Sequence, residues 1–220
     1  MNKKVYIDLS HTIEDGLITY KGLPAPIICD YLSREESRKL YEPGTEFQIG
    51  KIEMVSNTGT YVDVPFHRYA DGKDLSEIAI QKMAGLEGVI VSVDQNIEEI
   101  DEELFYGLNI EGKAVLIHTG WDRHWNTEQY FEHHPYLTEK AASYLSSQKA
   151  ALVGIDSYNI DDTSRKARPV HTTLLGEEIL IVEHLCNLQE LVNKQFLFYA
   201  VSPKFKGVGT FPVRAFAEIV

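Results

Sequence analysis

The sequence contains little cysteine. Its 220 residues include only Cys29 and Cys186, which lie far apart and are not in CxxC spacing. We therefore expect neither a disulfide framework nor a zinc site built from thiolates. This cysteine usage fits a reducing compartment, and we expect a cytoplasmic protein.

Long apolar runs and basic clusters are also missing. Lys3 and Lys4 lie near the start, but no apolar stretch of signal-peptide length follows, and no uninterrupted run is long enough to cross a bilayer. We therefore expect no membrane partner. The formal net charge of −12, without any basic run, argues against a nucleic-acid partner. By itself the acidic balance fits either solubility or a cation site lined by carboxylates.

What remains is the composition of a globular protein. Hydrophobic residues make up 44% of the chain and charged residues 25%, which argues against disordered and fibrous classes. The chain contains no internal repeat, low-complexity tract or Pro/Ser-rich linker. At this length, we predict one domain over residues 1–220.

Strands outnumber helices in the predicted secondary structure. Short apolar runs rich in Val, Ile or Phe are interpreted as strands over residues 5–9, 89–93, 114–118, 152–155, 179–182, 196–201 and 211–216. The clearest helix is predicted over residues 138–148, with Thr138 placed to cap its first turn. A shorter helix is predicted over 101–106. Because strands and helices do not alternate strictly, the pattern favours an α/β or α+β domain with a mixed sheet.

Two irregular segments are expected at the surface. Residues 121–135 are polar and aromatic, which suits a loop that overhangs a pocket or, equally, one that packs against the core. Residues 31–44 are rich in charge and are interpreted as a solvated face.

The segment 56–67 has the character of a rigid loop that positions functional groups. A glycine flanked by two threonines is followed by Asp63, Pro65 and His67 at short spacing, a pattern that suits neither a strand nor a helix. In an extended chain alternate residues point to the same side, so these three and Tyr61 are predicted to share a face. An oxygen ligand and an imidazole would then lie together. Taken alone, an Asp and a His four residues apart are more often structural.

A second group of polar residues lies far downstream. His171 precedes an apolar pair, and Glu183 ends the apolar run 179–182. A carboxylate at the end of such a strand is costly to bury unless it binds a cation or a hydrogen-bond donor. The alternative is a salt bridge from Glu183 to a nearby arginine or lysine.

These segments resemble the cyclase family of metal-dependent hydrolases, which includes bacterial kynurenine formamidases (arylformamidases) and isatin hydrolases. The resemblance runs along nearly the whole chain and is carried by residues 8–13, 59–67, 118–121, 154–156 and 171–188. It implies a cyclase-like α/β domain of the swivelling β/β/α type, with a mixed, barrel-like sheet and flanking helices.

The loop pattern of the family is only partly retained. The pattern is His-x-Gly-Thr-His-x-Asp with a further His four residues on, and here Asn57 and Tyr61 replace its first two histidines. In the family these two histidines are metal ligands, and neither Asn nor neutral Tyr matches imidazole as a zinc ligand. In family members with two metals, the second ion is held largely at the positions of Asp63, His171 and Glu183.

The resemblance implies hydrolysis of an amide, a formamide or a cyclic amide or ester by water activated at a divalent ion. Mixed oxygen and nitrogen ligands suit Zn²⁺, Mn²⁺ or Fe²⁺ without a sharp choice. His67 is the predicted general base or proton shuttle, because imidazole titrates near neutral pH. The predicted metal ligands are Asp63, His67, His171 and Glu183.

Four residues are predicted to contact a small-molecule substrate: Asn57, Tyr61, Phe66 and Trp121. The first two offer amide and hydroxyl hydrogen bonds, and the two large aromatic side chains are candidate walls, although aromatic residues more often belong to a core. The resemblance also implies a homo-oligomer, either a dimer or a tetramer. The alternative functions are a family member that binds a small molecule without catalysis, and a purely structural subunit, which leaves the retained polar residues unexplained.

Other polar residues near these segments have open roles. Arg68 is placed either to bind a substrate carboxylate or to pair with Asp63 or Asp71. Four histidines have no spacing that favours a metal and are interpreted as surface or loop residues: His124, His133, His134 and His184.

Overall fold

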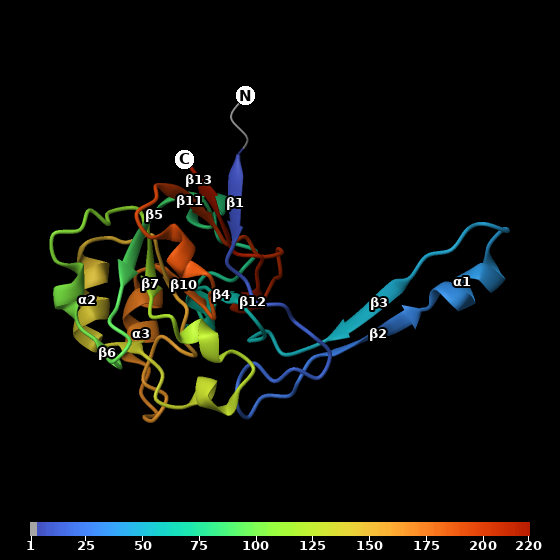
Figure 1. The fold of residues 1–220 in the computed structure, drawn as a ribbon, viewed down its shortest axis with the longest axis horizontal. Coiled ribbons are helices and arrows are strands. Elements are labelled where there is room, and N and C mark those ends of the chain that lie inside the picture. The colour runs from blue at the N-terminus through green and yellow to red at the C-terminus, as the bar shows by residue number, and fades with distance from the viewer. Residues whose placement is uncertain (1–3) are drawn as a thin grey trace.

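The computed structural model describes residues 4–220 and is built around one large, curled sheet with few helices (Figure 1). The strands of this sheet are β1 Val5–Asp8, β4 Tyr61–Asp63, β5 Ala84–Ser92, β7 Ala114–His118, β9 Leu152–Ile155, β10 Leu180–Glu183, β11 Phe196–Tyr199, β12 Thr210–Pro212 and β13 Phe216–Ile219. Within the described residues they form a nine-stranded sheet in the order β1-β13-β11-β5-β7-β9-β10-β4-β12. The first and last strands of the chain, β1 and β13, therefore pair at one edge.

The sheet is mixed, as the strand pattern predicted. The central strands β5, β7, β9 and β10 are parallel neighbours, whereas the strands on either side of them pair antiparallel. Parallel neighbours need long crossover connections, which here carry the helices. The predicted α/β class, with a barrel-like mixed sheet and flanking helices, is confirmed.

Each face of the sheet buries a hydrophobic core. In β7, Val115 and Ile117 belong to the core under the helices, whereas their neighbours belong to the core inside the curl. The helices α2 Glu139–Ser147 and α3 Pro169–Gly176 pack against each other on the first of these faces (Figure 1). Successive strand residues point to opposite faces, so a strand buried on both sides is a continuous apolar run. This explains why the sequence predicts β7 within its observed bounds.

Most of the predicted elements are confirmed. The runs 5–9, 114–118, 152–155, 179–182 and 196–201 match β1, β7, β9, β10 and β11, and 89–93 covers the end of the longer β5. The predicted helix 138–148 is α2, and the Thr138 hydroxyl oxygen accepts from the Ala141 N–H at 3.1 Å, as expected of a cap. The predicted helix 101–106 is only a 3₁₀ turn, Glu102–Phe105, capped by Asp101.

The predicted strand 211–216 is wrong as one element. It is divided between β12, which pairs with β4, and β13, which pairs with β1 and β11 near the other end of the sheet. Between the two strands, Val213 N–H donates to the Thr60 carbonyl, and the Ala215 carbonyl accepts from Leu9 N–H. The alternating sequence does not indicate this division. It arises because the curled sheet lets one short segment pair with β4 near one end of the sheet and with β1 and β11 near the other.

A hairpin arm projects from the body of the molecule (Figure 1). It consists of β2 Ile27–Leu32, the short helix α1 Arg34–Leu40 and β3 Ile49–Glu53, with β2 and β3 antiparallel. The helix starts with a capping box between Ser33 and Glu36. Residues 31–44 are mostly exposed, as the charge pattern predicted, but the arm itself was not predicted.

A small parallel pair joins β6 Glu99–Ile100 to β8 Tyr136–Leu137. Among residues 4–220, no helix combines the length and the apolar character that crossing a membrane requires.

Candidate active site

The loop that leads into β4 is held in place by hydrogen bonds to distant segments. Gly59 N–H donates to the Thr19 hydroxyl at 3.0 Å, and the Thr60 hydroxyl donates to the His184 carbonyl at 2.5 Å. Gly59 has a φ of +66°, which favours glycine, and a side chain there would also collide with Ile13. The loop is therefore rigid, as its composition predicted.

Strand pairing brings the two predicted groups of polar residues together. β4 lies between β10 and β12, so Tyr61 is paired with Glu183 and Asp63 with Thr210. After Val64 the chain turns into a 3₁₀ helix, Pro65–His67, and the extended alternation stops.

This turn corrects one prediction for the loop. His67 returns toward Asp63, with Nδ1 3.6 Å from Asp63 Oδ1. Pro65 is buried and faces Gly72. It does not share the face of Tyr61, Asp63 and His67.

Asp63 is fully buried at the centre of this group. Its Oδ1 accepts a short hydrogen bond from the Thr210 hydroxyl, while Oδ2 has no hydrogen-bond partner among the described residues. Oδ2 lies 3.6 Å from Nε2 of His171. Burial alone would raise the pKa of Asp63, but the imidazoles of His67 and His171 and the Thr210 hydroxyl together lower it.

His171 lies in the first turn of α3 and is oriented by Asp161. Asp161 Oδ2 lies 2.6 Å from His171 Nδ1, and the same carboxylate accepts the N–H groups of Val170 and His171. Nδ1 thus carries the proton shared with Asp161, and Nε2 is left facing Asp63 and Glu183. Burial lowers the pKa of His171, but the hydrogen bond to Asp161 and the nearby carboxylates of Asp63 and Glu183 outweigh it and raise the pKa to about 10. The sequence pattern did not identify Asp161, which is ten residues before the imidazole that it orients.

Glu183 lies at the end of β10 and is fully buried. Its Oε2 accepts the Tyr61 hydroxyl at 2.5 Å and the Asn159 amide at 3.4 Å, and its Oε1 accepts the Ile160 N–H at 2.6 Å. His171 Nε2 lies 3.8 Å from Oε1. The alternative of a salt bridge to an arginine or lysine is therefore wrong.

Burial is the largest influence on the pKa values of Glu183 and Tyr61. It raises the pKa of Glu183 to about 7, with the Asp63 charge acting in the same direction and His171 opposing it. Burial and the neighbouring Glu183 charge also raise the pKa of Tyr61 well above its ordinary value. Tyr61 therefore remains a neutral hydroxyl that donates to the carboxylate.

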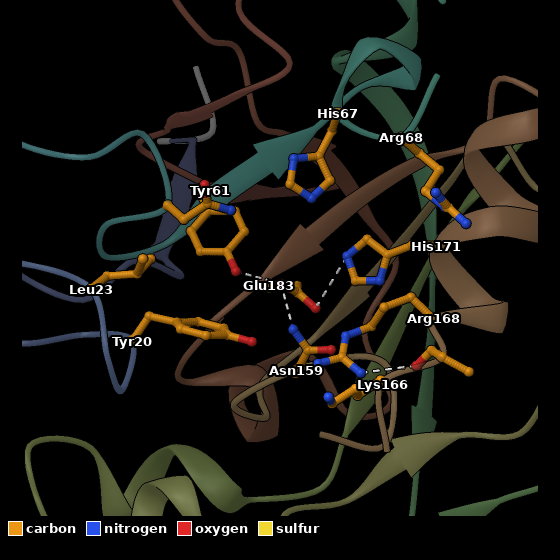
Figure 2. A pocket seen from close by; sticks show the side chains of 12 residues that line it. Tyr20, Leu23, Tyr61, His67, Arg68, Asn159, Lys166, Arg168, His171 and Glu183 are labelled. Carbon is orange, nitrogen blue, oxygen red and sulfur yellow. Dashed lines mark hydrogen bonds and ion pairs between the residues drawn. The ribbon is translucent and has the colours of Figure 1, made fainter. Parts of the chain in front are cut away.

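A cavity of about 440 Å³ opens over this group (Figure 2). Five of the predicted ligands and substrate contacts line it, together with Arg68: Asn57, Tyr61, His67, His171 and Glu183. Figure 2 shows Tyr61, His67 and His171 around Glu183 at its floor. Residues that the sequence did not assign to the site also line it, among them Tyr20, Asn159, Lys166 and Arg168. These come from loops whose course no local pattern predicts.

Two predicted substrate contacts do not line this cavity. Trp121 is buried in an aromatic cluster with Tyr130 and Tyr158, and its indole N–H donates to the Tyr130 carbonyl at 3.1 Å. Phe66 packs against the core inside the curl of the sheet. Segment 121–135 therefore contributes to packing, which was the second of the two interpretations of it.

Two of the histidines that were interpreted as surface or loop residues are buried. His184 is fully enclosed, and its Nδ1 lies 2.9 Å from the Tyr130 hydroxyl. His134 lies between the Pro135 carbonyl and the Thr163 hydroxyl. Neither histidine belongs to the group around Asp63 that could bind a metal. This agrees with the sequence, in which their spacing did not favour a metal.

The group around Asp63 fits a divalent metal ion. Asp63, His67 and His171 each offer a ligand atom, and these atoms lie within 4.8 Å of one another. Ligand atoms at about 2.0–2.2 Å from one ion are typically about 3–4 Å apart, and the distances from His171 Nε2 to Asp63 and Glu183 are 3.6 and 3.8 Å. The unpartnered, buried Asp63 Oδ2 is the atom for which a cation is most needed.

Comparisons with known proteins agree with this fold. Residues 7–162 match the sequence profile of the cyclase family, described as "Putative cyclase". A kynurenine formamidase of Bacillus cereus is 28% identical over 217 residues, covering 98% of both chains. A solved structure described as a potential metal-dependent hydrolase with cyclase activity has a TM-score of 0.80 at 23% identity, covering 98% of both chains.

A second solved structure, isatin hydrolase A from Labrenzia aggregata, has a TM-score of 0.80 at 18% identity. The match covers 98% of this chain and 94% of the isatin hydrolase chain. At these identities the solved structures establish the shared fold. The sequence profile matches more than half of the chain, and the chain therefore belongs to the cyclase family.

Proposed function

We propose that the protein is a metal-dependent hydrolase that cleaves an amide, a formamide or a cyclic amide or ester. The observation that carries this proposal is that the buried Asp63 meets His171 and Glu183, which line the cavity, and that one Asp63 carboxylate oxygen has no partner among the described residues. Membership of the cyclase family, and relatives named kynurenine formamidase and isatin hydrolase, support amide chemistry.

Asp63, His171 and Glu183 are the proposed ligands of one divalent ion, and His67 is a fourth ligand only in the alternative in which it is not the base. When bound, such an ion supplies a Lewis acid that polarises a carbonyl and lowers the pKa of water toward neutrality. Zn²⁺, Mn²⁺ and Fe²⁺ all suit two carboxylates and one or two imidazoles. Asp161 fixes the His171 tautomer, and Tyr61 and Asn159 hold the Glu183 carboxylate in place.

His67 is the proposed general base. Thr210 donates its hydroxyl proton to Asp63, so its oxygen accepts the Nδ1–H of His67 at 2.8 Å. The Nε2 lone pair of His67 is then free to take a proton from the attacking water and to return it to the leaving nitrogen. The imidazole side chain is 34% exposed, which leaves a route for exchange with solvent.

The cavity sets the scale of the substrate. A volume of about 440 Å³ suits a small organic molecule. Asn57 lines the wall and offers its amide to a substrate oxygen, whereas the Tyr61 hydroxyl is engaged by Glu183. We therefore assign Asn57 to substrate binding and Tyr61 to positioning Glu183.

We also infer that the chain, as one domain over residues 1–220, forms a homo-oligomer through its arm. A two-stranded hairpin without a core is marginally stable in water. The arm nevertheless exposes large apolar side chains on both strands, including Tyr31 at 75% and Ile52 at 62% exposure. A second copy of the chain is the proposed cover, since an apolar surface of this kind marks an interface.

A cytoplasmic location completes the proposal. Both cysteines are free thiols, and Cys29 is exposed on the arm. An exposed free thiol persists best in a reducing compartment.

The test combines metal analysis with hydrolysis. Protein purified without chelator is analysed for bound metal and assayed on aromatic formamides, anilides and lactones, with and without added Mn²⁺ or Zn²⁺. We expect about one ion per chain, with loss of metal and of at least about 100-fold in kcat/KM in the Asp63→Ala and Glu183→Ala variants. Asp101→Ala, in an acidic cluster outside the cavity, is the control and should retain both.

Two outcomes would redirect this proposal. A protein that holds no stoichiometric metal under any loading condition is not the proposed hydrolase. If metal binds but none of the substrates is cleaved, the replacement of two family histidines by Asn57 and Tyr61 favours the alternative function, a family member that binds a small molecule without catalysis.

A further inference from the structure

Three basic side chains at the cavity have no acidic partner. Arg68, Lys166 and Arg168 line it, in a chain with a formal net charge of −12. Most other lysines and arginines among residues 4–220 lie within 4.0 Å of a carboxylate, whereas none of these three does. An acidic surface offers many partners, so unpaired cations gathered at one cavity point to a ligand with negative charge.

Arg168 is held in place for such a ligand. Its Nη1 donates to the carbonyls of Asp162, Arg165 and Ala167 at 3.2, 2.6 and 2.9 Å, which fixes the side chain at the start of α3. Nε and Nη2 donate to no acceptor within the described part of the chain at hydrogen-bond geometry. Figure 2 shows the guanidinium beside Asn159, with Lys166 next to it and Tyr20 facing it from the other side.

Lys166 and Arg68 extend this positive region in different ways. Lys166 is exposed and makes no hydrogen bond or ion pair with residues 4–220, so its ammonium group is available to a ligand. Arg68 donates through Nε to the Thr172 hydroxyl at 3.0 Å, which leaves its two terminal nitrogens unused. The sequence left open whether Arg68 pairs with Asp63 or Asp71. The structure shows neither pair.

The carboxylates near the cavity do not pair with these basic side chains. Glu183 accepts hydrogen bonds from Tyr61, Asn159 and Ile160, and Asp63 faces Thr210 and the two imidazoles. The carboxylates beneath the cavity face hydroxyl, amide and imidazole groups, with Asp63 Oδ2 left for the proposed cation, whereas the basic groups of the wall face no carboxylate among residues 4–220. The two ends of a bound molecule would meet different electrostatic environments.

We propose that Arg168 and Lys166 form a subsite for a carboxylate, so that the substrate is an anionic amide. Its carboxylate lies against the fork of Arg168 and the ammonium of Lys166, and its scissile amide reaches toward Asp63 and His67. A planar guanidinium with two free donors matches a carboxylate in geometry, and the lysine adds a point charge. The amide part of this inference rests on the proposed function, whereas carboxylate binding does not.

Calorimetric titration with benzoate and with neutral benzamide tests the subsite without catalysis. The metal-loaded protein is compared with Lys166→Gln and Arg168→Lys, the second of which keeps the charge but loses the fork. We expect benzoate to bind about 10-fold more weakly to each variant and benzamide to be unaffected. Binding of benzoate should also weaken with added salt.

The matched control is Lys194→Gln, which removes one positive charge at an exposed position outside the cavity. Its benzoate affinity should stay within about twofold of the parent protein. Equal benzoate binding by the parent, Lys166→Gln and Arg168→Lys would overturn the subsite, because carboxylate binding would then come from the metal alone. Circular dichroism of each variant establishes that it is folded.

A pair of substrates separates this inference from the proposed function. An aromatic formamide with a carboxylate is compared with its methyl ester, and we expect kcat/KM to be about 10-fold higher for the acid. Lys166→Gln should raise KM for the acid alone. If neither compound is cleaved but benzoate binding depends on Lys166 and Arg168, the hydrolase proposal fails and the subsite stands. Equal cleavage of both, with unchanged binding by the variants, leaves the hydrolase and removes the subsite.

Discussion

Tyr61 occupies a position where the family pattern has a metal-binding histidine, and its side chain acts differently. Its hydroxyl donates to Glu183 at 2.5 Å, and the residue is 1% exposed. The donor is therefore part of the environment that keeps a buried carboxylate in one orientation. At this position a tyrosine therefore holds Glu183, a proposed ligand, where the family pattern has a histidine ligand.

Replacing Tyr61 with Phe tests this role. The substitution removes the hydroxyl and leaves Glu183 Oε2 with only the longer contact from Asn159. We expect the affinity for the metal to fall by about 10- to 100-fold and the free energy of unfolding to fall by about 1–3 kcal/mol. Competition with a chelator measures the first quantity, and urea denaturation of the metal-free protein measures the second.

Tyr136→Phe is the matched control for this experiment. Its hydroxyl also donates to a carboxylate, Glu99, at 2.8 Å, but at an exposed site away from the cavity. It should leave metal affinity unchanged. If Tyr61→Phe binds metal as tightly as the parent protein, Tyr61 does not position Glu183.

At the scale of elements, the site depends on how strands are paired. β4 is a strand of three residues, yet it is inserted between β10 and β12 and so places Tyr61 beside Glu183 and Asp63 beside Thr210. The helix α3, which packs against β10, adds His171 to this group. The arm is the opposite case, because within residues 4–220 β2 and β3 pair only with each other.

We predict that the exposed arm forms the interface between two copies of the chain. Ile28 and Ile52 face each other across the two strands and are both exposed. Replacing both with Asp should prevent a second copy from covering the arm, because each charge would have to be desolvated in the interface. We expect sedimentation to give a multiple of 25.0 kDa for the parent protein and 25.0 kDa for the variant.

Lys51→Asp controls for a new carboxylate on the same strand, since that position is already charged and exposed. It should leave the assembly intact. A parent protein that sediments as a monomer, or a double variant that keeps its assembly, would show that the arm is not the interface.

The stability of the whole molecule includes buried histidines outside the site. Burial lowers the pKa of His134 from 6.5 to about 4, despite a hydrogen bond to Pro135 that acts in the other direction. The unfolded chain gains a proton at this residue as the pH falls through about 6.5, while the folded protein stays neutral there down to about 4. The contribution of His134 to stability is thus present above pH 6.5 and is lost as the pH falls toward 4.

His134→Gln should remove this part of the pH dependence. Between about pH 7.5 and about pH 5, the His134 contribution to the unfolding free energy falls by about 2 kcal/mol in the parent protein. The variant should therefore gain about 2 kcal/mol relative to the parent at the lower pH. Urea denaturation at both pH values measures the difference, and His133→Gln, at the exposed neighbouring residue, is the control. An equal pH dependence in all three proteins would contradict the prediction.

Several parts of the structure could be predicted because their signals are local. The strands β7 and β9 are apolar on both faces, and α2 has both its cap and its apolar face within a few residues. The motif from Asn57 to His67 also lies in one short segment, so its likeness to the family could be recognised without a structure. The same holds for the low cysteine content and the acidic balance.

Only the tertiary structure decided which distant residues meet. The pairing of β4 with β10 joins Tyr61 to Glu183, and a loop brings Asp161 to His171. The tertiary structure also places Trp121 in the packed interior and Arg168 at the cavity wall. The physical reason is that periodicity reports which face of an element is buried, whereas contacts between elements depend on strand register and on the curl of the sheet. The sequence therefore determined the family and most of the chemistry, and the fold decided the partners of each group.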